Sequence, residues 1–270
     1  MRKPSFPLFI AFVTAFLAFS ELAVAAAGFN IQPLRLDLSA RQRTTSLELT
    51  NLTDRDIPVQ IKVFSWSQKD GVDVLERSRD IFLAPPITNV KAASKQIVRF
   101  RLKRGADTEK ERSYRVFIEQ IPPSDPQLRA AMEFRLRFSV PLFVSPIRYS
   151  EPEFNVTATE SDKGIAVSLE NTGNIHLKIK GIGVYGSDQN EGDIKEGESL
   201  ATAGNSSTGN GYALPGMSQQ WLIPLSAAQQ SSNGYKIAVT TDYFNSSGRG
   251  NVLPAGVIWL PVNGTATPSR

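Results

Sequence analysis

The clearest chemical pattern in this sequence is one alternating segment, Met132–Leu142. If the segment is a strand, its apolar side chains share one face, because successive side chains of a strand point to opposite sides. The members of this row are Met132, Phe134, Leu136, Phe138, Val140 and Leu142. Such a row either packs into the core of its own domain or lies at a sheet edge and completes the sheet of another protein, through backbone hydrogen bonds and pockets for alternate side chains. Pro141 has no N–H, so strand pairing there is one-sided or already finished.

Other chemistry is scarce in the chain. It contains no cysteine and one histidine, which excludes disulfides, thiol nucleophiles, cysteine-ligated zinc and multi-histidine metal sites. The sequence also lacks the Gly-x-Ser-x-Gly elbow of the hydrolases. We therefore expect no enzyme activity, no metal site and no cofactor. His176 follows a turn-like Asn171–Asn174 segment, and we expect it at a strand edge without a functional role.

Residues 1–27 have the pattern of a cleavable export signal. Arg2 and Lys3 precede an apolar run, Leu8–Phe19, and small residues follow it, which predicts cleavage after Ala25 or Ala27. The apolar run is shorter than the roughly 20 residues that span a bilayer. We expect an exported protein with no stable membrane insertion.

The charge distribution divides the remaining chain. Residues 28–149 contain 21 lysines and arginines against 14 acidic residues, a net charge of +7. Residues 150–270 contain 7 against 11, a net charge of −4. The basic residues alternate with apolar ones in an exported chain, which argues against nucleic acid and favours an acidic partner or a carboxylate. The sign change and the Pro-containing stretch near residues 147–152 predict two domains, 28–148 and 149–270.

Period-2 patterns dominate both halves, and no long 3.6-residue period is present. Expected strands in the first half include Asn30–Leu38, Val59–Trp66, Gln96–Leu102, Tyr114–Ile121 and a long strand over 131–144. Shorter strand patterns continue beyond residue 152. Regularly spaced short strands separated by turn signals predict an all-β protein of two immunoglobulin-like β-sandwich domains.

Several motifs give the first half a specific resemblance. They are Phe-Asn-Ile-Gln-Pro-Leu-Arg at 29–35, Phe-Leu-Ala-Pro-Pro at 82–86, Lys-Gln-Ile-Val-Arg-Phe at 95–100, a strand ending Ile-Pro-Pro at 121–123, and the long strand ending Leu-Phe-Val-Ser-Pro at 146. In order and spacing they resemble the periplasmic pilus-assembly chaperones of the chaperone–usher (PapD-like) family over about residues 29–149. The second half is similar in size and strand character alone.

The resemblance implies two sandwiches arranged in an L shape with a cleft between them. It also implies a periplasmic chaperone that binds and stabilises pilus or fimbrial subunits and delivers them to an outer-membrane usher. Members of the family lend one strand to a subunit that lacks its last strand. By alignment, Met132, Phe134 and Leu136 occupy the donor positions, with Phe138 and Val140 as extensions. Self-association through this edge is one way for the subunit-free protein to cover the row.

Family members also bind the terminal carboxylate of the subunit with two basic residues. The first aligns with Arg35, and a guanidinium suits a carboxylate because it donates two parallel hydrogen bonds. The second family position is a lysine just before the Leu-Phe pair, but this sequence has Pro141 there. The candidates for a substitute base are Arg99, Arg101, Arg115 and Arg137. This departure, together with the long apolar row, resembles the archaic branch of the family.

Two other functions fit parts of the sequence. One is an exported structural or adhesive fimbrial component built of two sandwiches, which would be found in the fibre rather than in a soluble pool. The other is a soluble carbohydrate- or peptide-binding sandwich, for which the sequence has no clustered aromatic platform. The sequence does not identify the subunit, the usher or the type of fibre.

Overall fold

A computed structural model describes residues 28–103, 109–122, 136–150, 152–186, 201–203, 211–225, 234–242, 256–262 and 265–266. Throughout these ranges every regular element is a β-strand, which confirms the all-β prediction. Among the described residues, no helix has the length and hydrophobicity that crossing a membrane requires.

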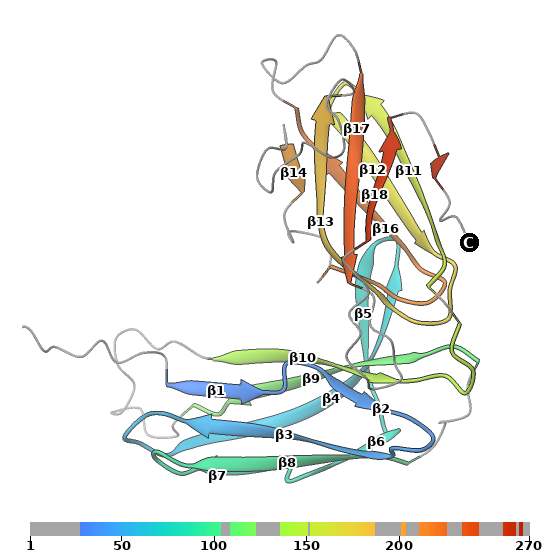
Figure 1. Cartoon of the computed structure of the whole chain (residues 1–270). Coiled ribbons are helices and arrows are strands. Elements are labelled where there is room, and N and C mark those ends of the chain that lie inside the picture. The colour runs from blue at the N-terminus through green and yellow to red at the C-terminus, as the bar shows by residue number, and fades with distance from the viewer. Residues whose placement is uncertain are drawn as a thin grey trace, which may run out of the picture.

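The strands up to Val144 form the two sheets of a first sandwich (Figure 1). The four-stranded sheet has the order β1-β3-β8-β6, made of β1 (Phe29–Gln32), β3 (Thr44–Asn51), β8 (Lys95–Leu102) and β6 (Ile81–Ala84). The six-stranded sheet has the order β2-β10-β9-β4-β5, with a further strand, β7, paired to β4. Its members are β2 (Leu36–Leu38), β10 (Arg137–Val144), β9 (Arg112–Gln120), β4 (Ile57–Lys69), β5 (Val72–Arg77) and β7 (Ile87–Val90).

The strands from Phe154 onward form a second sandwich. One of its sheets has the order β16-β12-β11-β19, with β16 (Ser218–Ile223), β12 (Gly164–Asn171), β11 (Phe154–Ser161) and β19 (Thr265–Ala266). The other has the order β14-β13-β17-β18, and β15 pairs with β13. Its members are β14 (Ala201–Ala203), β13 (Leu177–Gly186), β17 (Tyr235–Asp242), β18 (Gly256–Pro261) and β15 (Tyr212–Ala213).

Each sandwich is held by its own apolar core, built from alternate residues of its strands. In β8, for example, Val98, Phe100 and Leu102 are buried while Ile97, Arg99 and Arg101 face outward. Burial of each large side chain stabilises the fold by at most about 1.5–3 kcal/mol relative to exposure. The alternation that predicts these strands is therefore also what separates core from surface.

The structure divides the expected strand Asn30–Leu38 into two strands. β1 pairs antiparallel with β3 in the four-stranded sheet, whereas β2 pairs parallel with β10 in the six-stranded sheet. Pro33 lies between them, and a proline has no N–H to continue a strand ladder. The chain thus changes sheets immediately before Arg35.

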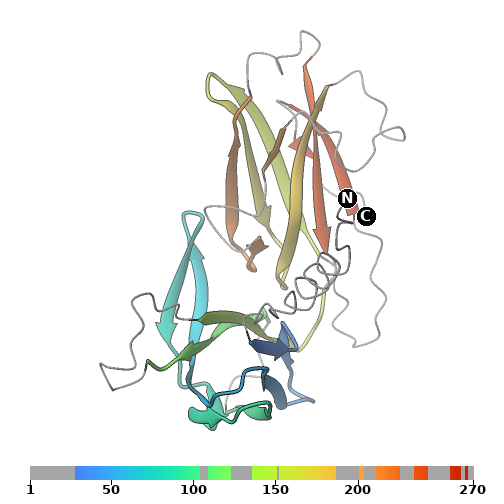
Figure 2. The same cartoon turned by 90° about the vertical axis from the view of Figure 1, so that its left-hand side faces the viewer.

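A long hairpin of the first sandwich, which the sequence pattern does not predict, packs against the second sandwich. β4 and β5 turn at Asp70 and Gly71, both of which have positive φ, a conformation that glycine adopts without strain. Figure 1 and Figure 2 both show this hairpin rising from the first sandwich to the side of the second. At the contact, Trp66 and Phe143 of the first sandwich form a small apolar cluster with Tyr212 and Leu214 of the second.

Candidate functional site

The site is the outward face of the six-stranded sheet, and its centre is a row of three residues across three strands. β2 runs parallel to β10 with Leu36 opposite Leu142, so Arg35, the residue before Leu36, comes level with Pro141. On the other side of β10, Pro141 lies opposite Arg115 of β9. The two arginines therefore flank Pro141, and both are sequence-predicted candidates for carboxylate binding.

Arg35 is half-buried at the edge of this row. Its Nε donates to Oδ2 of Asp37 at 3.0 Å, and 26% of its side chain is exposed. Asp37 lies opposite Phe143 in the register, so the pair lies on the outward face. An ion pair with this much exposure contributes little to stability. The contact with Asp37 therefore orients the Arg35 guanidinium and adds little to the stability of the fold.

Arg115 is almost fully buried, with 3% of the residue exposed. Its Cζ lies 3.7 Å from the centroid of the Trp66 ring and 5.6 Å from that of Tyr212, a residue of the second sandwich. Burial lowers the pKa of this guanidinium, and the negative charge of Asp73 partly opposes that effect. Its Nε and Nη2 have no hydrogen-bond partner among the described residues. The second sandwich thus covers a cation that is stacked on aromatic rings.

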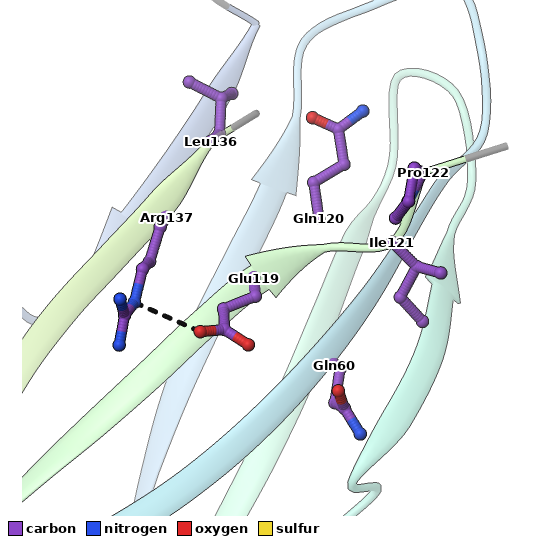
Figure 3. Close-up of a pocket in the computed structure, with 7 residues that line it drawn as sticks. All are labelled: Gln60, Glu119, Gln120, Ile121, Pro122, Leu136 and Arg137. Carbon is purple, nitrogen blue, oxygen red and sulfur yellow. Dashed lines mark ion pairs between the residues drawn. The ribbon is translucent and has the colours of Figure 1, made fainter. Parts of the chain in front are cut away.

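Arg137 lies at the open end of the same face, near the start of β10. Its Nε contacts Oε1 of Glu119 at 3.1 Å, and Lys62 Nζ contacts the other oxygen, Oε2, at 2.7 Å. Figure 3 shows the Arg137–Glu119 pair beside a hollow of about 370 Å³ lined also by Gln60, Ile121 and Leu136, among others. The Arg137 Cζ also lies 4.2 Å from the Phe117 ring centroid. Lys62 is not among the residues that the sequence motifs indicate for this site, although the alternation of β4 places it on the polar face.

The structure does not bring Arg99 and Arg101 to this face. Both lie on β8, where they face outward from the four-stranded sheet on the opposite side of the sandwich. Of the five candidate bases, three share the face of Pro141: Arg35, Arg115 and Arg137.

Strand β10 is paired on one side along part of its length. From Arg137 to Val144 it pairs with β9, but the pairing with β2 covers Leu142–Val144 alone. Within the described strands, nothing pairs with the other edge of β10 from Arg137 to Pro141. This segment therefore offers backbone groups with which an extended chain could pair.

The predicted donor residues divide along this strand. Leu136 and Phe138 are partly buried against the first core, and the Phe138 ring lies 6.0 Å from that of Phe29. Val140 is 3% exposed and belongs to the core itself. Its side chain therefore packs into its own domain in the absence of a partner, and its expected part in the donor row stays a prediction. Met132 and Phe134 lie outside the described residues.

His176 contributes to the junction of the two sandwiches, which its sequence context did not indicate. Its ring stacks on Phe143 with the centroids 3.7 Å apart, and its Nδ1 lies 2.8 Å from Oε1 of Glu111. Gln68 makes a second polar contact, because its Nε2 donates to Tyr212 O at 2.8 Å and its Oε1 accepts from Leu214 N at 3.0 Å. The covered end of the face is thus held by stacked rings and complementary hydrogen bonds.

Comparisons with known proteins agree with this architecture. Residues 28–149 match the family model described as pili and flagellar-assembly chaperone, PapD N-terminal domain. No curated protein matched the chain.

Solved structures with a similar fold include the CsuC–CsuE chaperone–tip adhesion subunit pre-assembly complex from archaic Csu pili of Acinetobacter baumannii. That match has 20% identity and a TM-score of 0.58, and it covers 87% of this chain and 98% of the other. The CupB2 chaperone of Pseudomonas aeruginosa matches with 14% identity, TM-score 0.52 and coverage of 87% and 99%. The Salmonella enterica SafA pilin–SafB chaperone complex matches with 14% identity, TM-score 0.52 and coverage of 89% and 96%. At these identities the likeness establishes the two-sandwich fold.

Proposed function

We propose, from the premise that this chain belongs through its N-terminal domain to the pili and flagellar-assembly chaperone family, that it is a periplasmic chaperone for pilus or fimbrial subunits. The observation that carries the proposal is the half-paired edge of β10 between Arg137 and Pro141. A subunit whose own sheet lacks a strand pairs with this edge and is thereby kept folded and soluble. An outer-membrane usher then receives the subunit. The proline in place of the family lysine, together with the likeness to the archaic Csu complex, favours the archaic branch.

Donor-strand complementation is the mechanism that fits this edge. The backbone from Arg137 to Pro141 supplies the hydrogen bonds, and the alternating row of Met132, Phe134, Leu136 and Phe138 supplies the apolar side chains. Each large side chain that becomes buried contributes about 1.5–3 kcal/mol before the cost of association. Val140 is already buried in its own domain and stays a predicted extension of the row.

We further propose that Arg35 binds the terminal carboxylate of the subunit, with Arg115 as the second positive charge. Support comes from the register, in which the two residues lie on either side of Pro141. Because Arg115 is buried and stacked on Trp66, it acts as a fixed charge beside Pro141, whereas Arg35 is exposed enough to donate directly. Arg137 and Lys62 extend the positive charge toward the open end of β10, where Glu119 partly neutralises them.

The test is recovery of the partner from the periplasm. The protein with a C-terminal tag is expressed together with its neighbouring genes, purified from the periplasm and analysed by mass spectrometry. We expect a small β-rich subunit in one-to-one stoichiometry. Phe134→Asp should abolish its recovery, because the substitution would bury a charge in the subunit groove. Arg35→Ala should reduce it.

Two matched variants control for general damage. Phe82→Asp and Arg101→Ala make the same chemical changes on the opposite sheet, where both residues are exposed, and should leave recovery unchanged. Full recovery with Phe134→Asp would exclude donor-strand complementation. Full recovery with Arg35→Ala would exclude that residue as the carboxylate ligand.

A further inference from the structure

The outward face of the four-stranded sheet contains a second basic and apolar surface that the proposed function does not use. A hollow of about 650 Å³ there is lined by Thr44, Ser46, Phe82, Ala84, Arg99 and Arg101, among others. In the register, Arg101 lies between Thr44 and Phe82, and Arg99 lies between Ser46 and Ala84. The small residues beside Arg99 form the hollow, and Phe82, 49% exposed, forms its apolar wall. We call these six residues the β8 groove.

The β8 groove carries positive charge that the sheet itself does not neutralise. Across the described part of the chain, neither Arg99 nor Arg101 has an ion-pair partner. The one acidic residue in the four strands is Glu48, and it already pairs with Lys95 at 2.7 Å. Lys103 adds a further positive charge, with its Nζ 5.7 Å from the centroid of the Phe82 ring. An acidic partner would thus meet cations that have no competing carboxylate.

The spacing of the two arginines specifies the form of that partner. Residues i and i+2 of a strand lie about 6.6 Å apart on the same face. Two carboxylates at i and i+2 of an extended chain have the same spacing. The arginines therefore match a segment of the pattern acidic-x-acidic, with each guanidinium able to bind one carboxylate through two parallel hydrogen bonds.

This protein contains such a segment, between β13 and β14. Residues 187–200 include Asp188, Glu191, Asp193, Glu196 and Glu198 against a single lysine, a net charge of −4. The acidic-x-acidic pattern occurs twice, as Glu191-Gly192-Asp193 and Glu196-Gly197-Glu198. These fourteen residues account for the whole negative excess of residues 150–270.

The segment is joined at both ends to the second sandwich, through Gly186 of β13 and Ala201 of β14. In Figure 1 the arrowhead of β13 is at the top of the molecule, whereas β8 is at the bottom. We propose that the β8 groove binds the acidic segment 187–200 of a second copy of this chain. The contact is head-to-tail, so a pair of copies still has one unoccupied groove at one end and one unbound acidic segment at the other. Further copies can add at either end, and the assemblies therefore lengthen as the protein concentration rises. The contact also leaves the open edge of β10 uncovered, because the two surfaces belong to different sheets.

The experiment is sedimentation equilibrium of the mature protein without its subunit, over a range of protein concentrations. At roughly 0.02 M salt, where the screening length is on the order of 20 Å, the average mass should rise with concentration. At roughly 0.5 M salt, where that length is only about 4 Å, it should return to the monomer value. The variant R99E/R101E and the variant E191K/D193K/E196K/E198K should each be monomeric at low salt. An equimolar mixture of the two should associate again. The unchanged groove of the second variant can bind the unchanged acidic segment of the first, and the two reversed surfaces are complementary as well.

Control variants separate this contact from other causes. R77E/R79E makes the same change in net charge, again at i and i+2 on exposed positions, and should associate like the wild type. Circular dichroism checks that each variant is folded. A wild type that stays monomeric at low salt, or association that R99E/R101E does not weaken, would overturn the proposal. So would association that Phe134→Asp abolishes, since the donor edge would then be the contact. No subunit takes part in these measurements, so their failure leaves the proposed chaperone function standing.

Discussion

The two outward faces of the first sandwich have similar residues in different environments. On the six-stranded sheet, Arg115 lies 3.7 Å above the ring of Trp66 and is buried. On the four-stranded sheet, Arg101 lies opposite Phe82 in the register, and both residues are exposed. The difference comes from the second sandwich, which covers the first pair with Tyr212 and leaves the second pair in solvent. An arginine beside an aromatic ring is thus a fixed internal charge in one place and a docking surface in the other.

The comparison predicts that the same truncation has very different effects on the two faces. Phe143→Ala should lower the free energy of unfolding by about 3–5 kcal/mol, because it leaves a cavity among Trp66, Tyr212 and His176. Phe82→Ala should change it by less than about 0.5 kcal/mol, since its ring is half exposed. Urea unfolding followed by circular dichroism measures both. Equal effects would mean that the two sandwiches do not pack as described.

A smaller effect is expected at Gln68, which forms hydrogen bonds across the covered face. Gln68→Ala should cost about 1–3 kcal/mol, because Tyr212 O and Leu214 N lose their partner in a buried place. The matched control is Gln60→Ala, on the same strand and the same outward face but beside the open hollow. Differential scanning calorimetry of both variants distinguishes the two positions. A Gln68 variant as stable as the Gln60 variant would show that the junction does not depend on this bridge.

Arg115 should separate stability from function. Arg115→Met removes a charge whose burial is unfavourable and retains apolar contact with Trp66, so stability should stay within about 1 kcal/mol of the wild type or rise. Recovery of the subunit should nevertheless fall, because the charge beside Pro141 is lost. Unfolding curves and periplasmic co-purification measure the two quantities on the same variant. A variant that loses stability and keeps full subunit recovery would make Arg115 a purely structural residue.

The smallest effect is expected from the ion pair between Glu48 and Lys95 on the outward face of the four-stranded sheet. A hydrogen bond from Lys95 lowers the pKa of Glu48, so the pair stabilises the folded state above the unfolded carboxyl pKa of about 4.3. That contribution is lost as the pH falls through the lower pKa of the folded state. Glu48→Gln should therefore melt slightly below the wild type at pH 7, and the gap should close at acidic pH. A gap that widens on acidification would contradict this assignment.

The sequence predicts much of the fold because alternation alone separates core from surface. Val98, Phe100 and Leu102 alternate with Ile97, Arg99 and Arg101, and the structure buries the first set and exposes the second. The same logic places Lys62 on the outward face. Alternation also predicts that Arg115 faces away from the first core, as it does.

The remaining features depend on contacts between distant parts of the chain. Burial of Arg115 and the stacking of His176 require residues of the second sandwich, which no local pattern reveals. The position of Arg35 beside Pro141 requires the change of sheet at Pro33 and the parallel register of β2 with β10. Val140 fits the apolar row as well as Phe138 does, but Val140 is buried in the core whereas Phe138 is partly buried against it. The donor role of Met132 and Phe134 stays a prediction.

The most direct test of the central claim is to map which edge of the first sandwich touches the subunit. A photo-reactive phenylalanine analogue is introduced at position 136, next to the open edge of β10, or at position 99 in the β8 groove. Cells expressing each variant with the neighbouring genes are irradiated, and the cross-linked partners are identified by mass spectrometry. We expect a pilus subunit cross-linked from position 136 and none from position 99. A subunit that cross-links from position 99 and not from position 136 would contradict the proposal that the subunit pairs with the edge of β10.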